Sequence, residues 1–255
     1  MIYLFTFVFA ACFASFFTSL ADRISYKRPI FASRSCCDNC FKTLKFWHLI
    51  PIFSYIFLKA RCSFCKKKLS FHLILGELLC VALAFVALFY TESFVDFLLL
   101  SLYFFILYTL ALIDIRLRAV PEFLLFILFV ISFFYMFDKL AFFDFYSDSF
   151  LLRICLFAGF IFLLKSLVSF FLNFKKYNKN LESMGEADIL LISSMSSILG
   201  FYHSFCMLFL ASLLAIIPCI RARLKGDLRY ELPMFPFLSI SFVIVFVGRN
   251  YEINL

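Results

Sequence analysis

The sequence predicts an all-α membrane protein that crosses the bilayer about eight times and carries a four-cysteine zinc-binding loop. Three observations predict this fold class. Of the 255 residues, 65% are hydrophobic and only 16% are charged. In a soluble domain about half of the residues are hydrophobic and about a quarter are charged. The apolar residues fall in runs as long as membrane helices. Lysine and arginine gather in alternate loops. This composition excludes an ordinary soluble domain.

Eight segments are candidates for membrane helices, each of which needs roughly 20 mostly apolar residues. They are 2–21, 73–91, 95–114, 120–137, 150–173, 185–200, 203–220 and 233–249. No basic residue precedes the first run, so we expect a retained helix rather than a cleavable signal. The stretch 189–220 has no Lys, Arg, Asp or Glu. It is too long for one span, and Gly200 offers a break.

The distribution of basic residues indicates how many times this stretch crosses the membrane. Eleven, two, three and four Lys and Arg fall in the loops 22–72, 115–119, 174–184 and 221–230. These loops lie on one side only if 185–220 crosses twice. Because basic loops stay in the cytoplasm, we expect eight helices with both termini extracytoplasmic.

The first loop, 22–72, contains two Cys-x2-Cys pairs, Cys37 with Cys40 and Cys62 with Cys65. Two such pairs are typical of tetrahedral zinc coordination by four thiolates. Four protein ligands leave no open position, which argues against a Lewis-acid role. We therefore predict a structural zinc ion that stabilises a loop too small for a robust core of its own.

Two alternatives accompany the zinc prediction. Cys-x2-Cys pairs can also cycle through disulfides, but a cytoplasmic loop lies in a reducing compartment. Cys36 adjoins Cys37 and would give a pair with three intervening residues, and we prefer Cys37. The five cysteines within the predicted spans are expected to be ordinary apolar residues.

Two aspartates are candidate catalytic residues. Asp114 ends the third predicted span and Asp188 opens the sixth, which places both at the cytoplasmic boundary although 74 positions separate them. Two carboxylates brought together can share one proton and hydrolyse a peptide, as in aspartic proteases. Acids at helix ends also serve as caps. Glu122 is expected to be a helix-start charge, and Glu77 could be a buried partner of a basic residue.

Together these motifs resemble the type IV prepilin peptidase family, which are bacterial inner-membrane aspartic proteases of the GxGD type. The resemblance runs over most of the chain. It is carried by residues 15–23, 35–40, 48–55, 61–65, 70–77, 113–122 and 233–237. One departure is Gly185-Glu186-Ala187-Asp188, where the family has Gly in place of Ala187.

The resemblance implies a function. Such enzymes cleave the basic leader from prepilins or pseudopilins after a Gly, at the cytoplasmic face of the bacterial inner membrane, and many also N-methylate the new N-terminus. It makes Asp114 and Asp188 the catalytic pair. It makes the four cysteines of the two pairs the metal ligands. The implied cofactors are zinc and S-adenosylmethionine, and the implied partners are the precursors and the lipid bilayer, with no nucleic acid. No Gly-rich loop identifies a methyl-donor site.

The sequence is also compatible with two other functions. One is a membrane thiol-disulfide redox protein, and the other is a non-catalytic scaffold of a pilus or secretion machine, which Ala187 favours. We expect three regions in the chain. They are a first transmembrane helix at 1–21, the zinc-binding loop at 22–72, and a membrane-embedded protease domain with seven helices at 73–255.

Overall fold

The computed structural model divides the chain into two compact units, Met1–Leu117 and Arg118–Leu255. The residues that it describes are 1–29, 35–37, 39–40, 42–45, 53–69, 71–137, 150–174, 185–224 and 232–253. Within these ranges the regular structure is helical, apart from two isolated β-bridges. The bridges lie in the predicted zinc-binding loop, which we call the cysteine loop. The predicted all-α class is confirmed.

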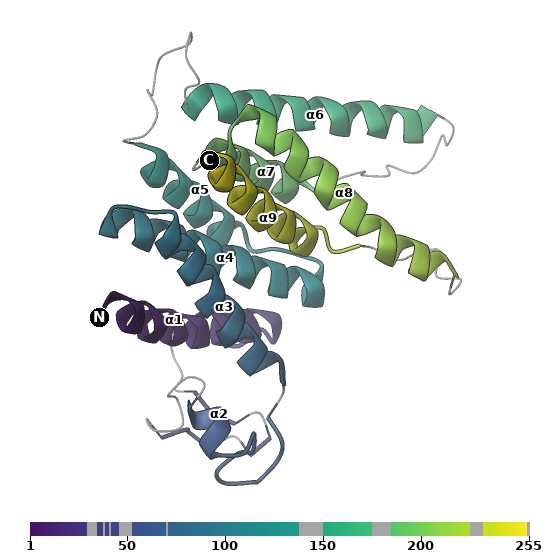
Figure 1. Ribbon diagram of the computed structural model, residues 1–255. Helices are drawn as coiled ribbons and strands as arrows, with labels where there is room; N and C mark the ends of the chain where they lie inside the picture. The colour runs from purple at the N-terminus through teal and green to yellow at the C-terminus, as the bar shows by residue number, and fades with distance from the viewer. Residues whose placement is uncertain are drawn as a thin grey trace. The chain divides into compact units, whose positions relative to one another are not determined.

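The first unit consists of three long helices and the cysteine loop (Figure 1). Helix α1 spans Ile2–Ser25, α3 spans Phe71–Phe89 and α4 spans Phe94–Leu117. Each of the three packs against the other two. The loop between α1 and α3 contains the short helix α2 (Phe53–Phe57). The loop is therefore anchored at both ends to helices that touch one another.

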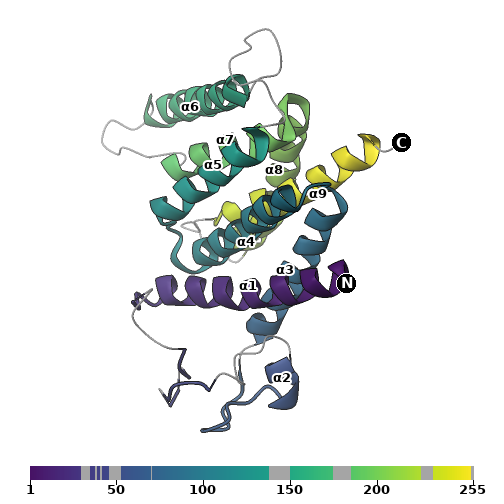
Figure 2. The ribbon, with the colours of Figure 1, turned by 90° about the vertical axis from the view of Figure 1, so that its left-hand side faces the viewer.

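Helices α1 and α4 run parallel (Figure 2). Near their N-terminal ends, the rings of Phe9 and Phe97 lie with their centroids 5.8 Å apart. At their C-terminal ends, Arg116 of α4 forms an ion pair with Asp22 of α1. The C-terminal ends of α1 and α4 therefore lie on the same side of the unit.

The three helices lie close together at Gly76 of α3. A Cβ atom there would overlap the hydroxyl of Tyr108 on α4 and would lie 3.1 Å from the Oγ1 of Thr18 on α1. Small residues allow membrane helices to approach in this way, because packing rather than hydrophobicity drives their association.

Replacing Gly76 by alanine should destabilise the first unit. The added methyl group must push Tyr108 aside, and overpacking of this kind costs about 1–3 kcal/mol. Gly248→Ala is the matched control, since nothing lies within 4 Å of a Cβ at that helical position and alanine favours a helix. Thermal unfolding in detergent should show a lower midpoint for Gly76→Ala alone. Equal midpoints for the two variants would show that the three helices do not meet at Gly76.

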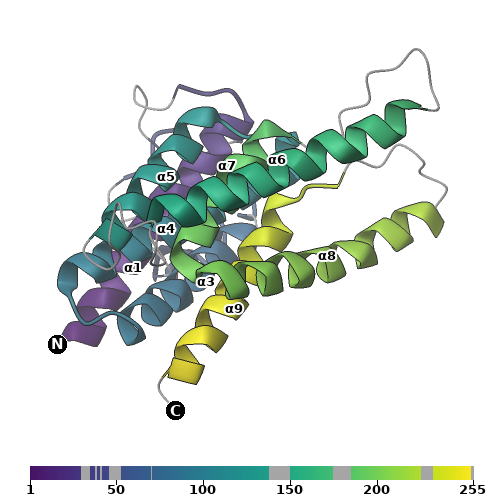
Figure 3. The same cartoon turned by 90° about the horizontal axis from the view of Figure 1, so that it is seen from above.

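The described part of the second unit contains five helices, and Figure 3 shows α6 crossing above α7. The helices are α5 (Glu122–Phe137), α6 (Phe150–Phe174), α7 (Glu186–Leu199), α8 (Phe201–Leu224) and α9 (Phe235–Ile253). Helix α7 is central, because it packs against the other four. Ten of its 14 residues are buried.

Four serines are among the buried residues of α7. Each hydroxyl donates a hydrogen bond to the carbonyl three residues earlier, at 2.7–2.9 Å. Because these hydroxyls are satisfied within the helix, they do not oppose burial. Their small size lets the surrounding helices approach α7 closely. The serines are Ser193, Ser194, Ser196 and Ser197.

All eight predicted segments are helical, and the predicted break occurs at Gly200, whose φ of +82° separates α7 from α8. Among the residues that the structure describes, four helices are long and apolar enough to cross a membrane. They are Ile2–Ser25, Phe94–Leu117, Leu151–Ser169 and Phe201–Leu224. Three others are apolar but shorter, and α7 has 14 residues, or about 21 Å. The bilayer core is about 30 Å thick. The count of eight spans therefore stays a prediction.

Candidate functional site

The four cysteines predicted to bind metal lie together in the first unit. The Sγ atoms of Cys37, Cys40, Cys62 and Cys65 are all within 4.8 Å of one another. The Sγ atoms of Cys37 and Cys65 are 3.8 Å apart. A tetrahedron with Zn–S bonds of about 2.3 Å has edges of about 3.8 Å, so the four thiols fit one tetrahedral ion. The ion would have no open position.

The stretch 36–43 and the stretch 61–68 have the same pattern of backbone hydrogen bonds. In each stretch the N–H of the first cysteine donates to the carbonyl of the lysine five positions later, at 3.1 Å to Lys42 and at 2.9 Å to Lys67. The two β-bridges, Cys36 with Thr43 and Arg61 with Lys68, occupy matching places 25 positions apart. This correspondence pairs Cys37 with Cys62, and Cys36 lies outside the four-cysteine cluster.

In each of the two stretches, a lysine side chain contacts a residue of the other stretch. The ammonium of Lys67 donates a hydrogen bond of 2.9 Å to the Oδ1 of Asn39, which lies between Cys37 and Cys40. The ammonium of Lys42 lies 5.4 Å from the ring centre of Phe64, within cation–π range. Each lysine thus reaches the turn of the other stretch. A Zn²⁺ ion with four thiolates carries a net negative charge, which nearby cations stabilise.

The thiols of the cluster differ in acidity. The backbone N–H of Lys67 contributes most to lowering the pKa of Cys65 to about 6. At Cys40 the N–H of Lys42 acts in the same direction, but burial and the three neighbouring thiols together raise the pKa to about 11. Metal ligation requires thiolates, so a metal bound here would hold Cys40 in its deprotonated form.

Asp114 is a buried acid near the C-terminal end of α4, where its side chain is 6% exposed. Two residues later, Arg116 forms the ion pair with Asp22 of α1. This ion pair fixes the end of the helix that carries Asp114. An acid buried in a membrane protein is most often functional.

Asp188 is a buried acid at the start of α7 and is 8% exposed. The helix begins after Gly185, and a Cβ at Gly185 would lie 3.6 Å from the Oδ2 of Asp188. The carboxylate therefore lies close to the helix N-terminus, whose dipole stabilises negative charge. Ala187 lies within the helix and not among the residues with positive φ. Alanine adopts a helical conformation readily, so replacing the family's glycine adds no backbone strain here.

The structure places Asp114 in the first unit and Asp188 in the second. Their pairing therefore stays a prediction. Of the two other acids, Glu77 is half-buried on α3, and Glu122 is exposed at the first residue of α5, as expected of a helix-start charge.

Two arginines bind the C-terminal end of α7, a role that the sequence analysis did not assign. Arg153 of α6 is 7% exposed and donates a 3.3 Å hydrogen bond to the carbonyl of Ser197. Arg249 of α9 donates a 2.6 Å bond to the carbonyl of Ile198. These carbonyls have no partner within the helix, and cations at a helix C-terminus are stabilising. In the sequence Arg153 is an isolated charge within a predicted span, and Arg249 is an isolated charge at the end of one.

Removing the Arg153 guanidinium should loosen the helix that carries Asp188. Arg153→Met leaves the buried carbonyl of Ser197 without its donor, and a hydrogen bond from a charged group contributes about 1.5–3 kcal/mol. We expect a lower unfolding midpoint, with partial recovery in Arg153→Lys. Arg223→Met, at an exposed position of α8, is the matched control. If Arg153→Met unfolds at the same temperature as this control, Arg153 does not anchor α7.

Two family models match the chain. The model of the Bacterial Peptidase A24 N-terminal domain matches residues 8–91, and that of the Type IV leader peptidase family matches residues 100–220. The first covers most of α1, the cysteine loop and α3, and the second includes both candidate aspartates.

Curated relatives carry one shared name, prepilin leader peptidase/N-methyltransferase. The protein of that name from Vibrio cholerae is 29% identical over 216 residues, which are 84% of this chain and 81% of the relative. The one from Bacillus subtilis is 36% identical over 77 residues, 30% of this chain and 31% of the relative. The one from Myxococcus xanthus is 34% identical over 84 residues, 33% and 25% of the two chains. No solved structure matches.

Proposed function

The chain belongs to the type IV leader peptidase family, and we propose that it cleaves the leader peptide from type IV prepilins or pseudopilins at the cytoplasmic face of the bacterial inner membrane. The match to the Vibrio cholerae relative over 84% of the chain carries this conclusion. The leader peptidase model spans both buried aspartates. The family model and the shared name of the relatives support an enzyme of this family.

We propose that Asp114 and Asp188 form the hydrolytic pair. Both are buried, and both lie at helix ends that the basic loops assign to the cytoplasmic boundary. Two carboxylates at hydrogen-bonding range share one proton. The ionised carboxylate takes a proton from a water molecule, whose oxygen attacks the scissile carbonyl, and the protonated carboxyl donates to the carbonyl oxygen. The C–N bond of the resulting tetrahedral intermediate then breaks, and the leaving amine takes the proton that the first carboxylate received from water. The cleavage would then follow the Gly that precedes the mature N-terminus.

We propose the eight-helix arrangement with both termini extracytoplasmic. Contacts within each unit support it. The ion pair of Asp22 with Arg116 brings together the C-terminal ends of α1 and α4, which this arrangement places in the cytoplasm. In the second unit, Arg153 and Arg249 bring the start of α6 and the end of α9 to the end of α7. This arrangement places all three of those ends outside.

The zinc and methyl-transfer proposals complete this function. Zinc held by the four cysteines would stabilise the loop 22–72, between the first helix at 1–21 and the protease domain at 73–255. S-adenosylmethionine would supply a methyl group on a sulfonium, which the new N-terminal amine can accept, and the shared name of the relatives supports this activity. The proposed partners are the precursors and the lipid bilayer, with no nucleic acid.

One incubation tests the function. The purified protein is mixed with a prepilin that has a basic leader, with and without S-adenosylmethionine, and the product is analysed by mass spectrometry. We expect a trimmed product in both mixtures and an added methyl mass only with the donor. An uncut prepilin that stays bound to the protein would indicate a scaffold. A trimmed product that never gains the methyl mass would restrict the protein to a peptidase.

A further inference from the structure

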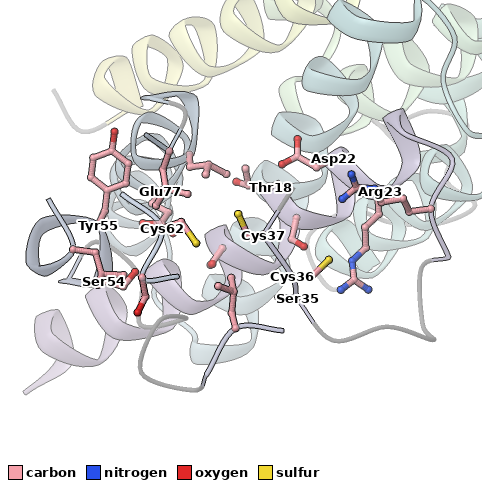
Figure 4. Close-up of a pocket in the computed structure, with 18 residues that line it drawn as sticks. Thr18, Asp22, Arg23, Ser35, Cys36, Cys37, Ser54, Tyr55, Cys62 and Glu77 are labelled. Carbon is pink, nitrogen blue, oxygen red and sulfur yellow. The ribbon is translucent and has the colours of Figure 1, made fainter. Parts of the chain in front are cut away.

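The cysteine loop lies beside the last turns of α1. A cavity of about 220 Å³ lies between the two, and residues between Ser15 and Arg23 line it on α1. Figure 4 shows Ser54 and Tyr55 of the loop on the opposite side of this cavity from Asp22. Helix α1 has 24 residues, or about 36 Å, and the bilayer core is about 30 Å thick. The last turns of α1 therefore reach the lipid headgroups, and the loop lies at the same depth.

The short helix α2 has one face on this cavity and one face away from it. Ser54, Tyr55 and Leu58 line the cavity. Ile56 and Phe57 lie between them in the chain and are 62% and 81% exposed. Neighbouring apolar side chains this exposed mark a contact surface. At headgroup depth, such side chains are buried at the boundary between the headgroups and the acyl chains.

The loop also carries the net positive charge of the chain. The stretch 22–72 has eleven Lys and Arg against two acids, a net charge of +9, whereas the whole chain carries +8. One of the two acids, Asp22, forms the ion pair with Arg116. Among the described residues of this stretch, eight Lys and Arg are exposed and no acid is. An exposed surface of this charge attracts anions.

Five of the exposed cations are carried by the stretch that follows Phe57. Lys59 and Arg61 come directly after it, and the β-bridge between Arg61 and Lys68 brings the lysines at 66–68 back beside them. Clusters of about four to eight Lys and Arg directly cytoplasmic of a membrane helix bind anionic phospholipids. The loop thus combines two exposed apolar side chains with a cluster of this kind.

We propose that residues 56–61 and 66–68 bind the anionic phospholipids of the cytoplasmic leaflet, with Ile56 and Phe57 inserted between the headgroups. We call these residues the lipid-binding face. The basic leader of a prepilin has the same sign of charge as this face and would be repelled by it, so the leader is not the occupant. The face is independent of the proposed cleavage, but it depends on the proposed position of the loop in the cytoplasm.

Hydroxyl-radical footprinting of the full-length, zinc-loaded protein tests this proposal on the side chain of Phe57. The protein is placed in nanodiscs, one molecule in each, made of phosphatidylcholine alone or of phosphatidylcholine mixed with phosphatidylglycerol. Oxidation of Phe57 should be at least about fivefold slower in the discs with phosphatidylglycerol, because a single cation near an anionic leaflet already contributes about that factor to binding. Added salt should reduce the difference. Equal oxidation in the two kinds of disc would overturn the proposal.

Variants separate the cations of the lipid-binding face from positive charge in general. Lys59→Gln combined with Arg61→Gln should raise the oxidation of Phe57 in the discs with phosphatidylglycerol. Arg221→Gln combined with Arg223→Gln removes the same charge from the last turn of α8 and should leave Phe57 protected. Zinc content shows whether the cysteine loop of each variant is folded. If both double variants protect Phe57 equally, the cations of the loop do not bind the leaflet and the proposal fails.

The same discs distinguish the other occupants and the proposed function. Protection of Phe57 that appears only when two molecules share a disc would identify a second copy of the chain as the occupant, which overturns the proposal. The footprint is taken without prepilin, and cleavage of an added prepilin is measured separately. A wild type that cleaves but leaves Phe57 unprotected overturns the lipid-binding face alone, whereas one that protects Phe57 but does not cleave overturns only the proposed function.

Discussion

Asp114→Asn and Asp188→Asn should each abolish prepilin cleavage. Asparagine keeps the shape of the side chain but can neither accept a proton from water nor donate one as a carboxyl group. Loss of one member of a catalytic pair typically lowers turnover by about a thousandfold or more. The rate is measured by quantifying trimmed prepilin against time with purified protein in detergent.

Controls on the same helices separate catalysis from folding. Asp96→Asn changes an acid in the first turn of α4, and Glu186→Gln changes an exposed acid beside Asp188. Both should cleave at close to the wild-type rate. Membrane insertion and unfolding midpoints of the two asparagine variants should match the wild type. Near wild-type turnover in either asparagine variant would exclude that aspartate from the chemistry.

Replacing Cys37 and Cys62 together by serine should remove the bound metal. Metal analysis of the wild type should find about one equivalent of zinc, and the double variant should have none. Structural zinc contributes about 10–16 kcal/mol to the folding of small zinc-finger peptides, so its loss should unfold the cysteine loop. Limited proteolysis should then cut within 22–72.

Cys36→Ser is the matched control for the metal site. Cys36 adjoins Cys37 but lies outside the cluster, so this variant should keep its zinc and resist proteolysis. An active wild type that contains no metal, with the four cysteines in disulfides, would contradict the zinc site and restore the redox interpretation.

The sequence predicts much of the helical framework because membrane helices need long apolar runs. All eight predicted segments are helices, and the break at Gly200 follows from the uncharged stretch around it. The cysteine cluster is equally predictable, since Cys-x2-Cys spacing requires a tight turn that brings two thiols to one ion. These features depend on residues close together in the chain.

Other features depend on contacts between distant residues, which periodicity and spacing do not encode. The bonds of Arg153 and Arg249 to the end of α7 join three helices, and in the sequence each arginine is only an isolated charge. A pocket lies between α1, the cysteine loop and α3, and no local sequence motif predicts it.

The double variant with both Asp114→Asn and Asp188→Asn tests the central claim most directly. If the two carboxylates share one proton and act as a pair, removing either one removes the function of both. The single-turnover rate of the double variant should then equal that of the slower single variant. A double variant slower than either single one, by the product of the two separate effects, would contradict the account because it would show that the two aspartates act independently.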